Sequence, residues 1–279
     1  MFANIGKAYD TVEEEAHALD NFIANEKIIL EHNSGNSTFV LGHNEFSDLS
    51  WPEFKNTYTS GLMKSTRAKN FEALMATTAD TVDWVAKSAV TPVKNQGQCG
   101  SCWAFSTTGS AEGAFQIADN PLTSSSEQDL VSCAGFSRNQ GCNGGLMDNA
   151  FTWIESNCIV AEAAYQYTPG SGTTGTCKKT AAAAKVSGYS DVPQGSEPGV
   201  KSSIAQEPTS VATKADKSVF QLCKPGVGDF DSTQIFDSAH DLHPNICLQT
   251  YLLPNTIFLC ILAGLAMNIS FAQNYAPCP

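Results

Sequence analysis

The sequence has little positive charge. Its 279 residues include 16 Lys and Arg against 28 Asp and Glu, so the net charge is −12 and the isoelectric point is about 4.7. A surface of this sign repels phosphate backbones and anionic lipid headgroups. We therefore expect neither nucleic acid nor a membrane among the partners, and the charge suits an acidic or extracellular compartment.

Two other features are missing. The histidines, cysteines and carboxylates form no cluster with metal-ligand spacing, so we expect no metal and no cofactor. The first residues lead directly into polar, acidic sequence, without the apolar segment of a secretory signal peptide. Ten cysteines are nevertheless typical of an oxidising compartment. Because these two observations conflict, we expect the chain to be truncated at its N-terminus.

Residues 1–58 are polar and show helical spacing. Apolar and amide side chains recur every three or four residues, which predicts one face of a long helix. The residues on this face are Phe22, Asn25, Ile29 and Asn33. Ser50 and Pro52 then predict a second, short helix, because serine is a good N-cap and proline is tolerated in a first turn.

The rest of the chain changes character along its length. Residues 59–80 have the Thr, Ser, Ala and Lys composition of a linker. Helices are predicted beyond it, and strands follow later with a small helix between them. The expected helices are 102–118, 127–133, 146–157 and about 197–206, and the expected strands are 186–189 and 210–213. Helices first and strands later predict an α+β fold.

The C-terminal part differs from what precedes it. No Asp, Glu, Lys or Arg follows His243, and residues 257–267 are continuously apolar. This run is short of the roughly 20 residues that a membrane-spanning helix needs. It could instead be read as a signal-like apolar segment, but only if the reading frame were wrong here. We interpret 229–279 as a tail that leaves strand edges of the preceding domain unpaired.

One stretch of the sequence contains a candidate nucleophilic cysteine. Residues 96–105 read Gln-Gly-Gln-Cys-Gly-Ser-Cys-Trp-Ala-Phe and place Cys102 at the start of a predicted helix. A thiolate is the attacking form of cysteine, and the dipole of a helix N-terminus favours the negative charge. Cys99 and Cys102 also have the spacing of a redox Cys-x-x-Cys pair, which is the alternative interpretation of this stretch.

Three motifs together carry a family resemblance. The segment Cys-Gly-Ser-Cys-Trp at 99–103 resembles the nucleophile signature of papain and the cathepsins. Glu14 and the helix face above resemble the long-helix motif of papain-type propeptides, with Ala18 in place of an arginine. The second propeptide motif is complete at Gly42, Asn44, Phe46 and Asp48. The sequence therefore resembles a cathepsin L-like proenzyme, which implies a papain-like two-lobed α+β fold with a helical lobe, a truncated β-barrel lobe and a helical propeptide.

The resemblance also implies site residues. Cys102 would be the nucleophile, and the Gln96 amide would join the Cys102 backbone N–H in the oxyanion hole. The implied disulfides are Cys99–Cys142 and Cys133–Cys177, which oppose the redox interpretation. Residues of the substrate cleft would be Trp103, Gly144, Gly145, Leu146, Met147 and Ala212. Core packing is the alternative for the last three, and an apolar pocket would favour a bulky hydrophobic residue in the second substrate position.

The histidine base and the asparagine of such a site lack their expected sequence context. The papain-type base lies about 130–150 residues after the cysteine, a window that contains His240 and His243. The sequence around them lacks the expected glycine-bearing strand, Pro244 would interrupt a strand, and no Asn-Ser-Trp occurs. His240 is the candidate base, and the alternative is that both histidines belong to a non-homologous tail.

These inferences divide the chain into a propeptide (1–58), a linker with the maturation site (59–80), an incomplete peptidase domain (81–228) and the tail (229–279). The predicted function is a cysteine endopeptidase precursor that is monomeric, acts on polypeptides and binds its own propeptide. By family it would be secreted or lysosomal/vacuolar. The alternatives are an inactive homologue that binds proteases as an inhibitor or decoy, and a non-functional gene product.

Overall fold

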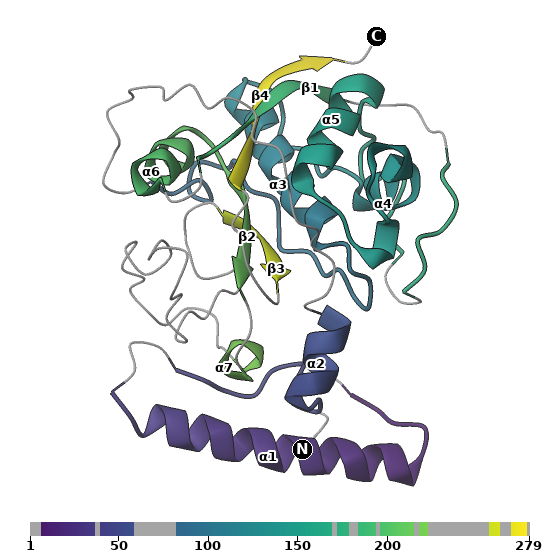
Figure 1. Cartoon of the computed structure of the whole chain (residues 1–279), viewed down its shortest axis with the longest axis vertical. Coiled ribbons are helices and arrows are strands. Elements are labelled where there is room, and N and C mark those ends of the chain that lie inside the picture. Colours follow the sequence, from purple (N-terminus) through teal and green to yellow (C-terminus); the bar gives the residue numbers. More distant parts are fainter. Residues whose placement is uncertain are drawn as a thin grey trace.

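The computed structural model describes residues 7–36, 40–58, 82–168, 172–178, 184–193, 196–214, 218–222, 257–262 and 269–277. Its architecture is the expected α+β fold. A long N-terminal helix lies across one end of the molecule, and the body consists of helices packed beside a four-stranded sheet (Figure 1). Among the described ranges, no helix has both the length and the apolar composition to cross a membrane.

The N-terminal helix α1 (Val12–Asn33) buries the predicted face. Its buried residues are Ala18, Phe22, Asn25 and Ile29. The helix begins with a capping box, in which Thr11 accepts from the Glu14 N–H and the Glu14 carboxylate accepts from the Thr11 N–H. Glu14 therefore caps its own helix. The small Ala18 side chain is buried on the same face of α1 as Phe22 and Asn25.

Asparagines on this face hold the segment that returns along α1. The Asn25 amide donates to the carbonyls of Ser47 and Leu49, both at 2.9 Å. The Asn33 amide donates to the Leu41 carbonyl at 2.9 Å and accepts from its N–H at 2.8 Å. These bonds satisfy backbone groups that no sheet or helix pairs, which explains why the buried face carries amides as well as apolar residues.

The remaining helices follow the prediction closely. α2 (Trp51–Tyr58) starts after Ser50, whose hydroxyl and N–H bond the Glu53 carboxylate. The helices of the body are α3 (Cys102–Ile117), α4 (Glu127–Cys133), α5 (Met147–Asn157), α6 (Glu197–Gln206) and α7 (Ser218–Gln221), with short 3₁₀ helices at Ala134–Ser137 and Gly141–Asn143. α3 is buried along nearly its whole length, so it forms the centre of the core.

The sheet has the strand order β1-β4-β2-β3. Its strands are β1 (Ala184–Asp191), β2 (Thr209–Lys214), β3 (Ile257–Leu262) and β4 (Ile269–Pro277). β4 pairs antiparallel with β1 and β2, whereas β3 pairs parallel with β2. β2 therefore has a partner on each side, so the expectation of unpaired strand edges is wrong for β2, whereas β1 stays at an edge of this sheet. Half of the residues in 257–262 are β-branched or aromatic, and these residues pack well on a pleated surface.

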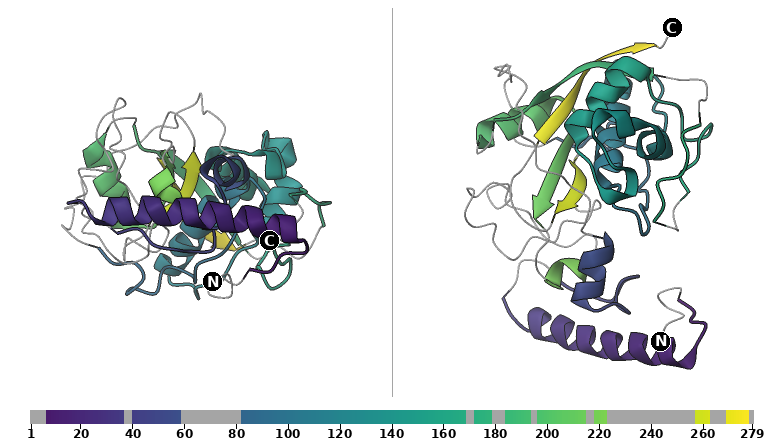
Figure 2. Two further views of the ribbon diagram at one scale, coloured as in Figure 1. Left: turned by 90° about the horizontal axis from the view of Figure 1, so that it is seen from below. Right: turned by 45° about the vertical axis from the view of Figure 1, so that its right-hand side comes forward.

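α7 joins the N-terminal unit to the body. The Gln221 side-chain amide donates to the backbone carbonyls of Phe46 and Leu49 at 2.7 and 2.8 Å. The backbone carbonyl of Gln221 accepts from the Asn44 side-chain amide at 2.7 Å. Leu222 is fully buried in a cluster with Ile29 and Leu41. α7 accordingly lies beside α2, between α1 and the sheet (Figure 1 and the right view of Figure 2).

Candidate active site

Cys102 lies where the sequence predicts it, as the first residue of α3. Its side chain is 1% exposed. Cys102 takes part in a disulfide. No cysteine among the described residues is free. In this state the Cys102 sulfur is not a thiol, so nucleophilic chemistry at this position requires its reduction.

The Gln96 side chain folds back over the loop that leads to α3. Its Nε2 donates to the Cys99 carbonyl at 3.0 Å. An amide nitrogen carries two hydrogens, so this bond fixes the side chain and uses one of them. The loop turns through Gly97, which has a φ of 59°, a conformation that costs glycine little.

Both predicted disulfides are confirmed. Cys99–Cys142 ties the loop to the 3₁₀ helix Gly141–Asn143, and the Gly100 N–H donates to the Cys142 carbonyl at 3.0 Å beside it. Cys133–Cys177 joins the end of α4 to a distant segment. Because Cys99 is paired with Cys142, it does not form the redox pair with Cys102.

A buried charge cluster anchors the segment before Gln96. Lys94 Nζ lies 2.8 Å from Glu112 Oε1 on α3 and 2.6 Å from Glu127 Oε1 on α4. Burial opposes the charge on Lys94, but the two carboxylates outweigh it and raise the pKa of the ammonium. Burial raises the pKa of Glu112. This cluster was missed from the sequence, since the three residues are far apart in the chain.

Most residues predicted to line the cleft lie in the interior. Trp103 is fully buried and donates from Nε1 to the Gly141 carbonyl at 3.1 Å. Met147 is fully buried in the core cluster around α3. A Cβ at Gly145 would lie 2.7 Å from Trp103 Cδ2, so this glycine permits close packing. Leu146 is also buried, and its N–H donates to Asn139 Oδ1 at 2.8 Å.

The remaining predicted site residues lie directly after a 3₁₀ helix, in a strand, or outside the described residues. Gly144 has a φ of 113°, which favours glycine. Ala212 lies in β2, in register with Cys260 of β3. His240, His243 and the linker 59–80 lie outside the described residues.

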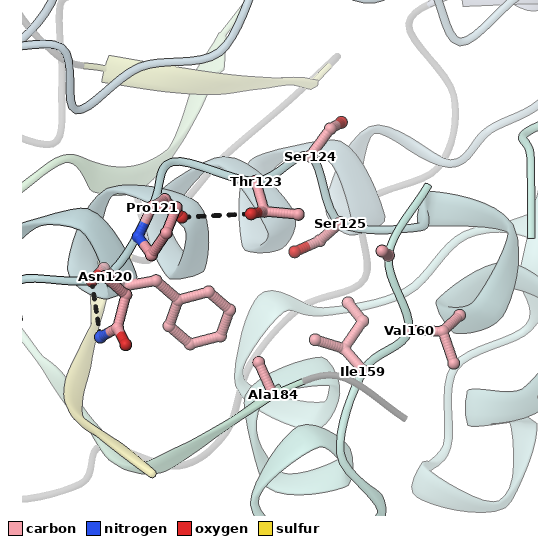
Figure 3. Close-up of a pocket in the computed structure, with 10 residues that line it drawn as sticks. Asn120, Pro121, Thr123, Ser124, Ser125, Ile159, Val160 and Ala184 are labelled. Atoms are coloured by element: carbon pink, nitrogen blue, oxygen red, sulfur yellow. Dashed lines mark hydrogen bonds between the residues drawn. The ribbon is translucent and has the colours of Figure 1, made fainter. Parts of the chain in front are cut away.

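A pocket of about 160 Å³ lies at the opposite end of α3 from Cys102. Its lining includes Phe115 near the end of the helix. Pro121, Thr123 and Ile159 also line it (Figure 3). Phe115 is 13 residues after Cys102 along α3, so at 1.5 Å per residue roughly 20 Å separate this pocket from Cys102. The pocket is therefore not part of the nucleophile site. Within the described part of the chain, no group of three His, Cys, Asp or Glu side chains could hold a metal ion.

Comparison with known proteins agrees with this geometry. The profile of the papain family cysteine proteases matches residues 78–243, and that of the cathepsin propeptide inhibitor domain (I29) matches residues 3–54. The senescence-specific cysteine protease SAG39 of Oryza sativa subsp. indica is 40% identical over 237 residues, which are 81% of this chain and 68% of the rice protein. Cysteine protease XCP2 of Arabidopsis thaliana is 41% identical over 236 residues, covering 81% and 66%.

Solved proenzymes have the same fold. Digestive procathepsin L 3 from the larval midgut of Tenebrio molitor aligns with a TM-score of 0.70 and 34% identity, over 81% of this chain and 74% of that one. Procathepsin L2 from the same tissue aligns with a TM-score of 0.77 and 27% identity, over 98% and 97%. The chain therefore belongs to the papain family of cysteine proteases and carries the inhibitor domain of a cathepsin-type propeptide.

Proposed function

We propose that this chain is the precursor of a cysteine endopeptidase with Cys102 as its nucleophile. The observation that supports this most is the position of Cys102 at the first turn of α3, directly after a loop held by Gln96 and the Cys99–Cys142 disulfide. In the proposed reaction the reduced thiolate attacks the scissile carbonyl carbon and expels the amine. Water then hydrolyses the resulting thioester.

The second amide hydrogen of Gln96 is the proposed donor to the oxyanion. Such a donor acts on charge that develops only in the transition state and contributes about 3 kcal/mol. His240 is the proposed base, from its position in the papain-type window. The proposed cleft residues are Trp103, Gly144, Gly145, Leu146, Met147 and Ala212, which would have to act through a rearranged cleft, since most are buried here.

The N-terminal unit is the proposed inhibitor of this activity and would be removed at a site in 59–80. Its contact with Gln221 and Leu222 of the body supports this division of the chain into propeptide and enzyme. The disulfides support synthesis into an oxidising compartment. We place the mature enzyme outside the cell or in a lysosome or vacuole, acting on polypeptides as a monomer.

The test uses the full chain in reductant at acidic pH, with a peptidyl epoxide that alkylates papain-type cysteines. We expect Cys102 to be labelled and a peptide with a bulky apolar residue in its second position to be hydrolysed. Both should be lost in Cys102→Ser and strongly reduced in His240→Ala. Hydrolysis that survives in Cys102→Ser would refute the nucleophile, and full activity in His240→Ala would refute the base.

A second candidate is a protease-binding inhibitor. The absence of Asn-Ser-Trp favours it, together with an N-terminal unit that is folded by its own buried asparagines. In this case the full chain would fail to label or hydrolyse, yet it would inhibit a related active papain-type protease. Failure of both assays would leave the non-functional gene product as the remaining interpretation.

A further inference from the structure

We propose that Tyr167 is a positioning residue that holds the two ends of the candidate oxyanion loop, Gln96 and Ser101, at a fixed spacing. Its hydroxyl contacts both ends. Tyr167 Oη donates to the backbone carbonyl of Gln96 at 2.8 Å and lies 2.7 Å from Ser101 Oγ. The catalytic part of this inference rests on the proposed function, whereas the ordering of the loop does not.

The direction of the two bonds follows from hydrogen counting. A phenol has one hydrogen, and the Gln96 carbonyl can only accept. Tyr167 therefore donates to Gln96, and Ser101 must donate to Tyr167. The other acceptor near Ser101 Oγ, the Cys99 carbonyl, is farther away at 3.4 Å. One oxygen atom thus connects the residue before the nucleophile to the residue that carries the proposed oxyanion amide.

Tyr167 is itself held from several sides. Its ring packs edge-on against Phe105 of α3, with centroids 4.8 Å apart. Its N–H donates to Glu162 Oε1 at 2.8 Å. The next residue, Thr168, donates from its N–H and hydroxyl to Gln128 Oε1 at 3.0 and 2.9 Å. The hydroxyl therefore projects from a backbone that α4 and the neighbouring turn keep in place.

The contact has a consequence for the start of α3. Serine at an N-cap normally accepts from backbone N–H groups of the first turn. Ser101 is the N-cap of α3, but its side chain makes no capping bond, and its hydroxyl lies 2.7 Å from the Tyr167 hydroxyl instead. The helix N-terminus at Cys102 is thereby kept clear of this side chain, where an anionic oxygen would be stabilised by the helix dipole.

Burial raises the pKa of the Tyr167 phenol, although the hydrogen bond from Ser101 opposes the shift. The hydroxyl consequently keeps its hydrogen across the acidic and neutral range, and both bonds persist there. Displacing a catalytic donor by about 1 Å can cost up to 100-fold in rate. We therefore expect Tyr167→Phe, which keeps the ring and removes both bonds, to lower kcat by about 10- to 100-fold with KM changed less than about twofold.

Tyr165 provides a matched control two residues away. Its hydroxyl donates to the Thr176 carbonyl at 3.0 Å, on a segment that does not belong to the loop. Tyr165→Phe removes one tyrosine hydroxyl from the same turn without touching Gln96 or Ser101. A merely structural role for Tyr167 predicts that the two variants differ in stability alone.

The experiment compares wild type, Tyr167→Phe and Tyr165→Phe. Deuterium uptake of residues 96–101 is measured in the full-length chains, and kcat and KM for peptide hydrolysis are measured in reductant at acidic pH after cleavage within 59–80. We expect faster uptake and lower kcat in Tyr167→Phe only. Adding Ser101→Ala to Tyr167→Phe should lower kcat little further, since Ser101 acts through Tyr167. Unchanged uptake, or a kcat loss equal to that of Tyr165→Phe, would overturn the proposal.

The two proposals fail separately. A wild type that hydrolyses no peptide even after cleavage within 59–80 has released the N-terminal unit refutes the proposed function and with it the catalytic part of this inference. The uptake comparison still decides whether Tyr167 orders the loop, because it needs no activity. Equal uptake of 96–101 in wild type and Tyr167→Phe would then overturn that part as well.

Discussion

Replacing Lys94 with methionine tests the buried charge cluster most directly. The substitution keeps a long apolar stem and removes the ammonium that lies 2.8 Å from Glu112 and 2.6 Å from Glu127. Both carboxylates are almost completely buried and would lose their counter-charge. Removing one partner of a buried ion pair costs about 3–5 kcal/mol. Domains are stabilised by roughly 5–15 kcal/mol, so the loss is a large share of the total.

The loss should depend on pH with a definite sign. Burial already raises the pKa of Glu112 in the folded state, and removing Lys94 raises it further. Below that pKa the carboxyl takes up a proton and no longer carries an uncompensated buried charge. The deficit in unfolding free energy should therefore be largest near pH 7 and shrink as the pH falls towards 4. Each additional unit of pKa shift corresponds to about 1.4 kcal/mol.

The assay is urea unfolding at pH 7 and pH 4.5, followed by tryptophan fluorescence in the full-length protein. Lys87→Met is the matched control, since Lys87 is exposed and its ammonium lies over the Trp84 ring, 4.3 Å from the ring centroid. We expect a loss below about 1 kcal/mol there. If Lys94→Met lost no more than Lys87→Met, or lost more at pH 4.5 than at pH 7, the reasoning about the cluster would be wrong.

Three further predictions concern single side chains. Burial raises the pKa of Asp129 from 3.8 to about 6, so wild-type stability should fall by roughly 2 kcal/mol between pH 4 and 7 through this group, and Asp129→Asn should flatten that slope in urea titrations. Asn25→Ala leaves the buried Ser47 carbonyl without its donor, whereas the Leu49 carbonyl keeps the Gln221 amide, so the loss should be about 1–3 kcal/mol, visible as faster hydrogen exchange across α1 while the body is unaffected. Gly145→Ala should destabilise the protein by about 1–3 kcal/mol in thermal unfolding, whereas Gly135→Ala, where a Cβ meets nothing within 4 Å, should not; equal Tm shifts would contradict the packing argument.

Much of the local structure could be predicted from the sequence. The spacing of Phe22, Asn25, Ile29 and Asn33 predicts the buried face of α1, and its four positions do contact the returning segment or the core below it. The helices at 127–133 and 197–206 have the predicted bounds. These features depend on contacts within a few turns or on hydrophobic periodicity, which a sequence displays directly.

The two disulfides and the position of Cys102 were also found from the sequence, but by resemblance to a family. No local rule pairs Cys99 with Cys142 across 43 residues. The tail (229–279) contains two strands that the sequence analysis did not predict. It matched no expected motif, yet β3 and β4 obtain their backbone partners from β1 and β2, and a strand read alone does not reveal its partner.

The sequence by itself determined the family, the nucleophile candidate and the helical face of the propeptide, because each is encoded in residues close together in the chain. Only the tertiary structure decided that Lys94 lies between Glu112 and Glu127, and that the Tyr167 hydroxyl joins Gln96 to Ser101. Tyr167 and Gln96 are 71 positions apart. Such contacts depend on how α3, α4 and their loops pack, and the geometry of a hydrogen bond within 3 Å exists only once that packing has formed.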